Sequence, residues 1–127
     1  KSLGGGEQGL CIYNQKLHWM RTPGVTSTAL NYVGNITSPL NTWTFVEFGW
    51  DDGTGYTFVN GALDGTFSDA TGWFNTGQLY TLGHLLNAGF DAYRFGLVGY
   101  LGGVRIISGG LRHKLPYSVP TAPLSRY

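Results

Sequence analysis

The clearest alternation of apolar and polar positions lies between residues 43 and 50. In an extended strand, even-numbered positions from Val46 to Trp50 fall on one face and odd-numbered positions from Trp43 to Glu47 on the other, because successive side chains point to opposite sides. The next apolar run ends at Asn60-Gly61, the dipeptide most typical of a two-residue hairpin turn. The pattern therefore predicts strands over 43–50, 56–59 and 62–67.

Shorter runs of the same kind predict further strands over 9–13, 16–20 and 79–83, and a short strand followed by a loop within 25–34. The run over 97–107 is the most apolar and β-branched stretch, and glycines interrupt it. It predicts a buried closing strand, with a bulge at Gly102-Gly103 that keeps Leu101 and Val104 on one face. The expected core consists of Trp43, Val46, Phe48, Phe58, Leu82, Leu101, Val104 and Ile106.

The last residues have a different character. After residue 110 the chain becomes basic and then contains Pro116, Pro120 and Pro123, which is typical of an extended segment lying on a surface. No window shows a convincing helical period. The 127 residues suit one domain. We therefore expect an all-β, antiparallel sandwich or barrel over residues 1–112 and an extended, Pro-containing C-terminal tail over 113–127.

Composition supports this fold class and excludes several functions. Charged residues make up 12%, about half the usual share of ~25%, and there are 21 glycines and 15% aromatic residues. Lys and Arg are scattered, so the chain lacks the basic patch that binds nucleic acid or anionic lipid. No apolar run approaches the ~18 residues of a membrane span. Cys11 is the only cysteine, which rules out an internal disulfide and a cysteine-rich zinc site.

Four apolar motifs follow one another between residues 41 and 106. They are Asn41-Thr-Trp43, Tyr56-Thr-Phe-Val-Asn-Gly61, Leu82-Gly83 and Leu97-x-Gly99-x-Leu101-x-x-Val104-Arg105-Ile106. Their order and spacing resemble the laminin-G-like / concanavalin A-like lectin-glucanase superfamily. The resemblance implies a jelly-roll β-sandwich in which two antiparallel sheets pack face to face.

The final motif and the tail extend this resemblance and also depart from it. Residues 104–123, which end in Pro-Thr-Ala-Pro, look like the copies of this module found in tailed-phage virion proteins. The family carries an acidic pair where this chain has Gly102-Gly103. The family also begins with an aromatic-rich strand that would precede residue 1. That strand is either missing from this chain or supplied by another chain.

The acidic residues argue against catalysis. Retaining glycosidases need two carboxylates about 5.5 Å apart, which on one strand means a spacing of two or four residues. Glu7 and Glu47 have no acidic partner two residues on, and a glycine and the strand end separate Glu47 from Asp51. A solvated role for Glu47 is the simpler interpretation. Because the three histidines are also scattered, the sequence predicts that the chain is not an enzyme.

Aromatic residues at strand ends and in loops are the candidates for ligand binding. Sugar rings stack on aromatic faces, and neighbouring polar groups bond the hydroxyls. These side chains could equally pack under their own loops. Asp51-Asp52 could also hold calcium, but turn chemistry explains this pair better, so no metal site or cofactor is predicted. The candidate glycan-binding residues are Trp50, Asp51, Asp52, Trp73, Tyr93 and Arg94.

Two functional hypotheses remain open. The first is a non-catalytic structural or adhesion module of a phage virion, in a capsid decoration, fibre or tail. It would be oligomeric, bind other copies of itself or other virion proteins, contact surface glycans, and bury residues 114–127 against another chain. The second is a lectin-like, glycan-binding module of a secreted or cell-surface protein. A glycoside hydrolase or polysaccharide lyase is a distant third.

Overall fold

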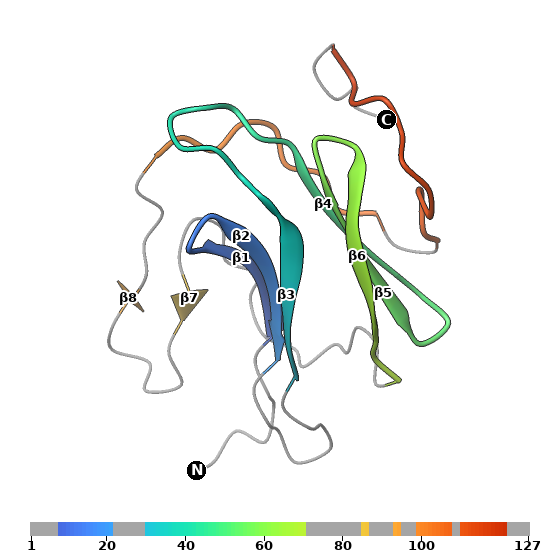
Figure 1. The fold of residues 1–127 in the computed structure, drawn as a ribbon. Helices are drawn as coiled ribbons and strands as arrows, with labels where there is room; N and C mark the ends of the chain where they lie inside the picture. Colours follow the sequence, from blue (N-terminus) through green and yellow to red (C-terminus); the bar gives the residue numbers. More distant parts are fainter. Residues whose placement is uncertain are drawn as a thin grey trace.

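The computed structural model is all-β and describes residues 8–21, 30–70, 85–86, 93–94, 99–107 and 110–121. Two three-stranded antiparallel sheets form its body (Figure 1), which confirms the predicted antiparallel sandwich. Over the described ranges there is no helix, and hence none long and apolar enough to cross a membrane. The strands are β1 (Gln8–Tyr13), β2 (Lys16–Arg21), β3 (Leu30–Thr37), β4 (Val46–Asp51), β5 (Thr54–Val59), β6 (Ala62–Ser68), and the two-residue strands β7 (Leu85–Leu86) and β8 (Tyr93–Arg94).

The sheet β4–β5–β6 follows the predicted pattern closely. Asn60 and Gly61 both have positive φ, at 50° and 77°, as a type I′ hairpin turn requires, and Val59 pairs with Ala62 across it. The strand predicted over 43–50 begins later, at Val46. The Asn60 side chain explains this shift, because its Oδ1 accepts the Phe45 N–H at 2.9 Å and replaces a strand partner.

The sheet β1–β2–β3 begins with a second tight hairpin. Asn14 and Gln15 have φ of 48° and 61°, and Tyr13 pairs with Lys16 across the turn. Both strands of this hairpin were predicted. The short strand and loop predicted within 25–34 match β3 only in part, because β3 is a strand from Leu30 to Thr37. Residues 22–29 lie outside the described ranges.

Aromatic rings and one buried carboxylate join the two sheets. Trp19 of β2 stacks on Phe48 of β4 with ring centroids 3.9 Å apart, and Tyr32 of β3 stacks on Phe67 of β6 at 4.6 Å. Trp19 is only 1% exposed. The even-numbered face of β4 therefore points toward the core, as the sequence predicted for Val46 and Phe48. Trp50, which was predicted as a ligand residue, shares this face.

The buried carboxylate belongs to Asp64 of β6, where β3 and β6 lie side by side (Figure 1). Its oxygens accept the Ile36 N–H at 2.5 Å and the Thr57 hydroxyl at 3.2 Å. Gly34 permits this approach, because a Cβ there would stand 1.8 Å from Asp64 Oδ2. Asp64 thus satisfies backbone and side-chain donors that burial cuts off from water.

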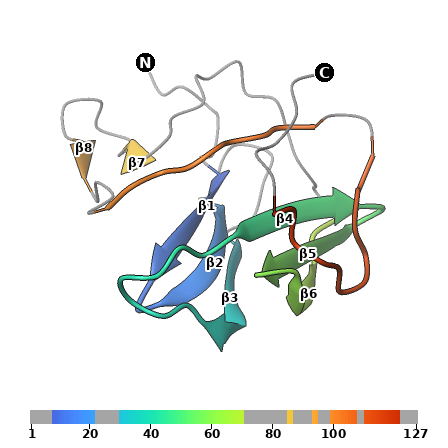
Figure 2. The same cartoon turned by 90° about the horizontal axis from the view of Figure 1, so that it is seen from above.

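The predicted closing strand is wrong over residues 99–107. These residues form no strand, and Figure 2 shows them as an extended segment outside both sheets. Leu101 and Ile106 are 57% and 65% exposed, and Trp43 is 72% exposed, so these expected core residues lie at the surface, as Val104 does. The three glycines at 99, 102 and 103 leave few side chains to pack, which weakens a strand. Leu82 lies outside the described ranges.

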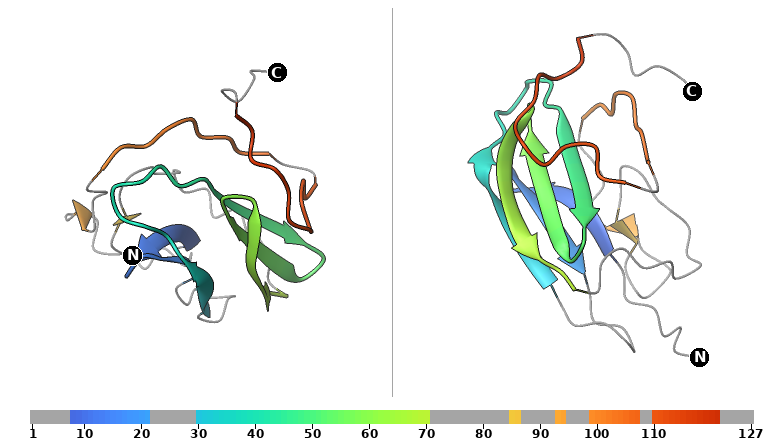
Figure 3. Two further views of the ribbon diagram at one scale, coloured as in Figure 1. Left: turned by 45° about the horizontal axis from the view of Figure 1, so that its top comes forward. Right: turned by 90° about the vertical axis from the view of Figure 1, so that its right-hand side faces the viewer.

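The predicted C-terminal tail is described as far as residue 121, and it is not apart from the sandwich. It turns between His113 and Tyr117, whose ring centroids lie 3.6 Å apart. Residues 110–121 form neither helix nor strand and cross the outer side of β4 and β5 (Figure 3, right). The Tyr117 N–H donates to the Gly61 carbonyl at 2.9 Å. Part of the segment that we expected to lie on another chain therefore lies on its own sheet.

Candidate functional site

The outer side of the sheet β4–β5–β6 carries a cluster of ionisable and aromatic groups. The register pairs Glu47 with Phe58 and Gly49 with Tyr56, so the odd-numbered residues of β4 share this side with the even-numbered residues of β5. Residues 111–119, which we term the docked tail, lie over it. We term the surface beneath them the docking face; it consists of Phe45, Glu47, Gly49, Asp51, Phe58 and Gly61.

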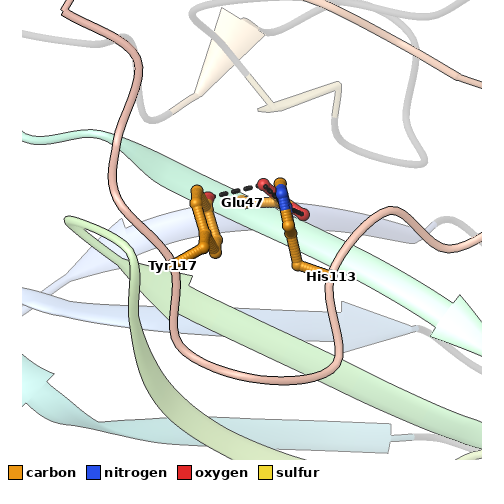
Figure 4. Close-up of polar contacts among 3 residues, drawn as sticks. All are labelled: Glu47, His113 and Tyr117. Atoms are coloured by element: carbon orange, nitrogen blue, oxygen red, sulfur yellow. Dashed lines mark hydrogen bonds and ion pairs between the residues drawn. The ribbon is translucent and has the colours of Figure 1, made fainter.

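Glu47 is the centre of the contact between tail and sheet. His113 Nδ1 lies 3.0 and 3.1 Å from the two carboxylate oxygens, and the Tyr117 hydroxyl donates to Oε2 at 2.5 Å (Figure 4). The His113 and Tyr117 rings stack with centroids 3.6 Å apart. The Glu47 side chain is only 18% exposed. Two residues of the docked tail thus bind a carboxylate that the sheet holds away from most of the solvent.

Aromatic and glycine residues shape the rest of the docking face. The buried Phe58 ring meets Tyr117 edge-on at 5.5 Å, and Phe45 meets it at 6.4 Å. Two glycines allow the tail to approach closely: a Cβ at Gly49 would stand 1.8 Å from Leu111 Cδ1, and one at Gly61 would stand 2.1 Å from the Tyr117 carbonyl oxygen. The face therefore fits a segment that presents an aromatic ring and an aliphatic side chain.

Lys114 and Tyr117 of the docked tail differ in their electrostatic surroundings. Burial, followed by the hydrogen bond and the charge of Glu47, raises the pKa of Tyr117 well above its usual range. The hydrogen bond to Asp51 and the charge of that carboxylate raise the pKa of Lys114. Lys114 is exposed and pairs with Asp51, so the ionic strength of the solvent screens this pair. The protected part of the contact is the one at Glu47.

The predicted glycan-binding residues do not form one cluster in the described structure. Trp50 belongs to the core-facing side of β4, where its indole N–H donates to the Asp69 carbonyl at 3.0 Å. Asp51, on the opposite side, pairs with Lys114. Asp52 lies in the tight turn between β4 and β5 with φ of 42°. Tyr93 and Arg94 form β8, which pairs with β7; Trp73 and the side chains of Tyr93 and Arg94 lie outside the described residues.

The turn between β4 and β5 explains the geometry of Asp51 and Asp52, the pair that was considered for calcium. The described residues contain no group of three His, Cys, Asp or Glu side chains that could hold an ion. Lys114 occupies one oxygen of Asp51, and the positive φ of Asp52 is followed by a positive φ of 76° at Gly53. This geometry is what the turn itself requires.

The sequence alone did not reveal the cluster at Glu47. Glu47 was expected to be solvated, and His113 and Tyr117 lie 66 and 70 residues away along the chain. A contact at that separation leaves no local period. One signal was present: Glu47 is an acid between the apolar residues Val46 and Phe48, and the basic tail carries a His and a Tyr four residues apart.

Comparison with known proteins supports the fold at the level of a family. A family model described as the concanavalin A-like lectin/glucanases superfamily matches residues 4–113. The comparisons with curated proteins and with solved structures give no significant match. The matched range includes both three-stranded sheets and the first residues of the docked tail. The chain therefore belongs to the concanavalin A-like lectin/glucanases superfamily.

Proposed function

We propose that the chain is a non-catalytic structural and adhesion module of a phage virion, which binds other copies of itself or other virion proteins. The observation that carries this proposal is the exposed apolar segment over residues 100–107. Tyr100 is 89% exposed, and Leu101, Val104, Ile106 and Ile107 are each about half exposed or more. Apolar side chains gathered at a surface are typical of protein interfaces.

The apolar surface extends beyond this segment. The ring of Trp43 lies close to Gly102, where an added Cβ would stand 3.4 Å from the ring. Trp43 is nevertheless largely exposed, and so is Leu40 in the same loop. Large aromatic side chains such as Trp and Tyr are the usual anchors at the centre of an interface, whose core is depleted in charged residues. The surface thus has the composition of one that another protein covers.

The absence of catalysis is part of the proposal, and the geometry at Glu47 and Asp51 supports it. Glu47 and Asp51 lie on the same side of β4, but His113 and Tyr117 bind the first and Lys114 binds the second. A glycosidase needs two carboxylates open to the sugar. Here the docked tail lies over both.

The assignment to a virion rests on the resemblance of the tail. Residues 104–123 resemble the same region of modules in tailed-phage virion proteins, and the low share of charged residues suits a multi-copy assembly with apolar interfaces. The structure adds that residues 111–119 lie against a specific face of the sandwich.

Light scattering coupled to size-exclusion chromatography tests the proposal. We expect the wild-type chain to form a regular oligomer and the double variant Leu101→Ser/Ile106→Ser to dissociate, because both side chains are exposed in the single chain. Ile12→Ser, at an exposed side chain of β1 outside this segment and outside the tail, is the matched control and should remain assembled. A monomeric wild-type chain at every concentration would remove the basis for the proposed self-assembly.

Glycan binding is the second candidate, and the exposed indole of Trp43 favours it. A flat, accessible Trp ring is a stacking surface for a sugar. Under this alternative the module belongs to a secreted or cell-surface protein. A glycan array should then retain the wild-type chain and lose Trp43→Ala, while an array that retains neither protein would exclude this function.

A further inference from the structure

We propose that the docking face also binds the tail of a second copy of the chain, so that neighbouring copies exchange residues 111–119. This proposal deepens the proposed function, because it rests on the assembly of copies. It names the surface and the segment through which one copy would hold the next.

The docked tail can leave the sandwich without breaking the hydrogen bonds of either sheet. It joins neither sheet, and the described backbone hydrogen bond that holds it to the face is the one from Tyr117 to Gly61. The other contacts are side-chain contacts, which Leu111, His113, Lys114 and Tyr117 supply. The same contacts can form between two copies, so that the closed and exchanged forms differ little in contact energy.

The charges of the two surfaces are complementary. The docked tail contains Arg112, His113 and Lys114 and no acidic residue. The docking face presents Glu47 and Asp51, which lie on the same side of β4. A basic segment that also carries a Tyr ring for Phe58 and a Leu side chain for Gly49 matches this face at four points. The second copy carries such a segment by necessity.

The sequence around the docked tail favours exchange. Gly109 and Gly110 precede it, and glycine imposes the least restriction on the direction in which the chain continues. Pro116 and Pro120 restrict the tail itself, which reduces the entropy lost when it binds. Within an assembly, a flexible linker of a few residues presents a neighbour's tail at an effective concentration on the order of millimolar.

Carbodiimide coupling tests the proposal on the wild-type chain, because it joins the Lys114 amine to the Asp51 carboxylate without a spacer. Chains labelled with ¹⁴N and ¹⁵N are mixed in equal amounts in denaturant, refolded together, coupled and digested. If all tails exchange, about half of the Asp51–Lys114 conjugates carry one peptide of each isotope, since partners are then drawn at random. Lys114→Arg keeps the charge but removes the amine, so the conjugate should disappear in this control.

The outcomes separate this proposal from the proposed function. Mixed-isotope conjugates in an assembled sample support tail exchange. Same-isotope conjugates in a sample that light scattering shows to be assembled would overturn tail exchange and leave the proposed function in place. Same-isotope conjugates in a monomeric sample would overturn both.

Discussion

The two sides of the sheet β4–β5–β6 are covered in different ways, one by the second sheet and the other by the docked tail. On the inner side the second sheet packs through stacked rings, with Trp19 on Phe48 and Tyr32 on Phe67. On the outer side the docked tail binds through Glu47, with one described backbone hydrogen bond at Gly61. The same strand, β4, supplies side chains to both covers, because its residues alternate between the two sides.

The difference between the covers is chemical. Ring stacking and apolar burial on the inner side do not depend on protonation, and the loss of one ring leaves a cavity. On the outer side most of the contacts involve groups that gain or lose a proton, and part of this contact is open to solvent. We therefore expect the packing between the two sheets to determine the stability of the fold. We expect the binding of the docked tail to depend on pH and on competition from other segments for the docking face.

The largest expected effect is on the inner side. Trp19→Ala should lower the free energy of unfolding by about 3–5 kcal/mol, the usual cost of removing a buried Trp ring. Trp43→Ala is the matched control, because this Trp is largely exposed, and it should change stability by no more than about 0.5 kcal/mol. Urea unfolding followed by circular dichroism measures both. Equal losses in the two variants would contradict the assignment of the core.

Asp64 should have the next largest effect. Asp64→Ala removes the acceptor for the Ile36 N–H and the Thr57 hydroxyl and leaves buried donors without it, at a cost of about 2–3 kcal/mol. Asp64→Asn keeps one oxygen acceptor in the same volume and should recover part of that loss in the same urea experiment. A neutral Asp64→Ala variant would show that this carboxylate does not join the sheets.

Tyr117 should make the contribution of the docked tail to stability depend on pH. Its raised pKa means that the folded chain keeps the hydroxyl protonated where the unfolded chain has lost the proton. The contribution of Tyr117 to stability is therefore complete below the ordinary tyrosine pKa of about 10 and falls as the pH rises above it. Tyr117→Phe should cost about 1 kcal/mol at neutral pH through the lost hydrogen bond to Glu47.

The control for this pH dependence is the Tyr117→Phe variant itself. Unfolding curves of wild type and variant between pH 8 and about pH 11 should converge as the pH rises, since only the wild type has this group to titrate. Curves that stay parallel over that range would show that Tyr117 ionises in the folded chain as readily as in the unfolded one.

The smallest effect belongs to Lys114. Its pair with Asp51 is exposed, and exposed ion pairs contribute little once side-chain entropy and screening are counted. Lys114→Ala should therefore leave the urea midpoint unchanged, both at low salt and at high salt. A salt-dependent loss of stability in this variant would place more of the tail's affinity at Asp51 than at Glu47.

Local patterns predicted the strands well where both a period and a turn were present. The alternation in β4 and the Asn60-Gly61 turn were sufficient to identify the strands and their hairpin, but not the core-facing side, because the expected core took Trp43 from one face and Phe48 from the other. The run at 97–107 has the apolar, β-branched composition of a strand, but the sequence does not identify a strand with which it would pair. Over 99–107 it lies exposed. Apolar composition alone does not distinguish a buried strand from an exposed interaction segment.

The cluster at Glu47 could not be predicted for a related reason. The tail's course over the sheet depends on Leu111 fitting above Gly49 and on the Tyr117 backbone meeting Gly61. These are contacts between segments more than fifty residues apart, and no periodicity reports them. Trp50, by contrast, was predicted only as a ligand residue, although the alternation placed it on the same face as Val46 and Phe48; its indole N–H donates to the Asp69 carbonyl.

Hydrogen exchange at single amides tests most directly whether the docked tail leaves the sheet while the two sheets stay packed, since it reports the opening of individual backbone hydrogen bonds. The Tyr117 amide, bonded to Gly61, should exchange much faster than the amides of β5, because the tail can leave while the sheets stay together. Glu47→Gln should speed exchange at Tyr117 further and leave β5 unchanged. Equal protection at Tyr117 and in β5, with or without Glu47, would contradict the account and make the tail a part of the core.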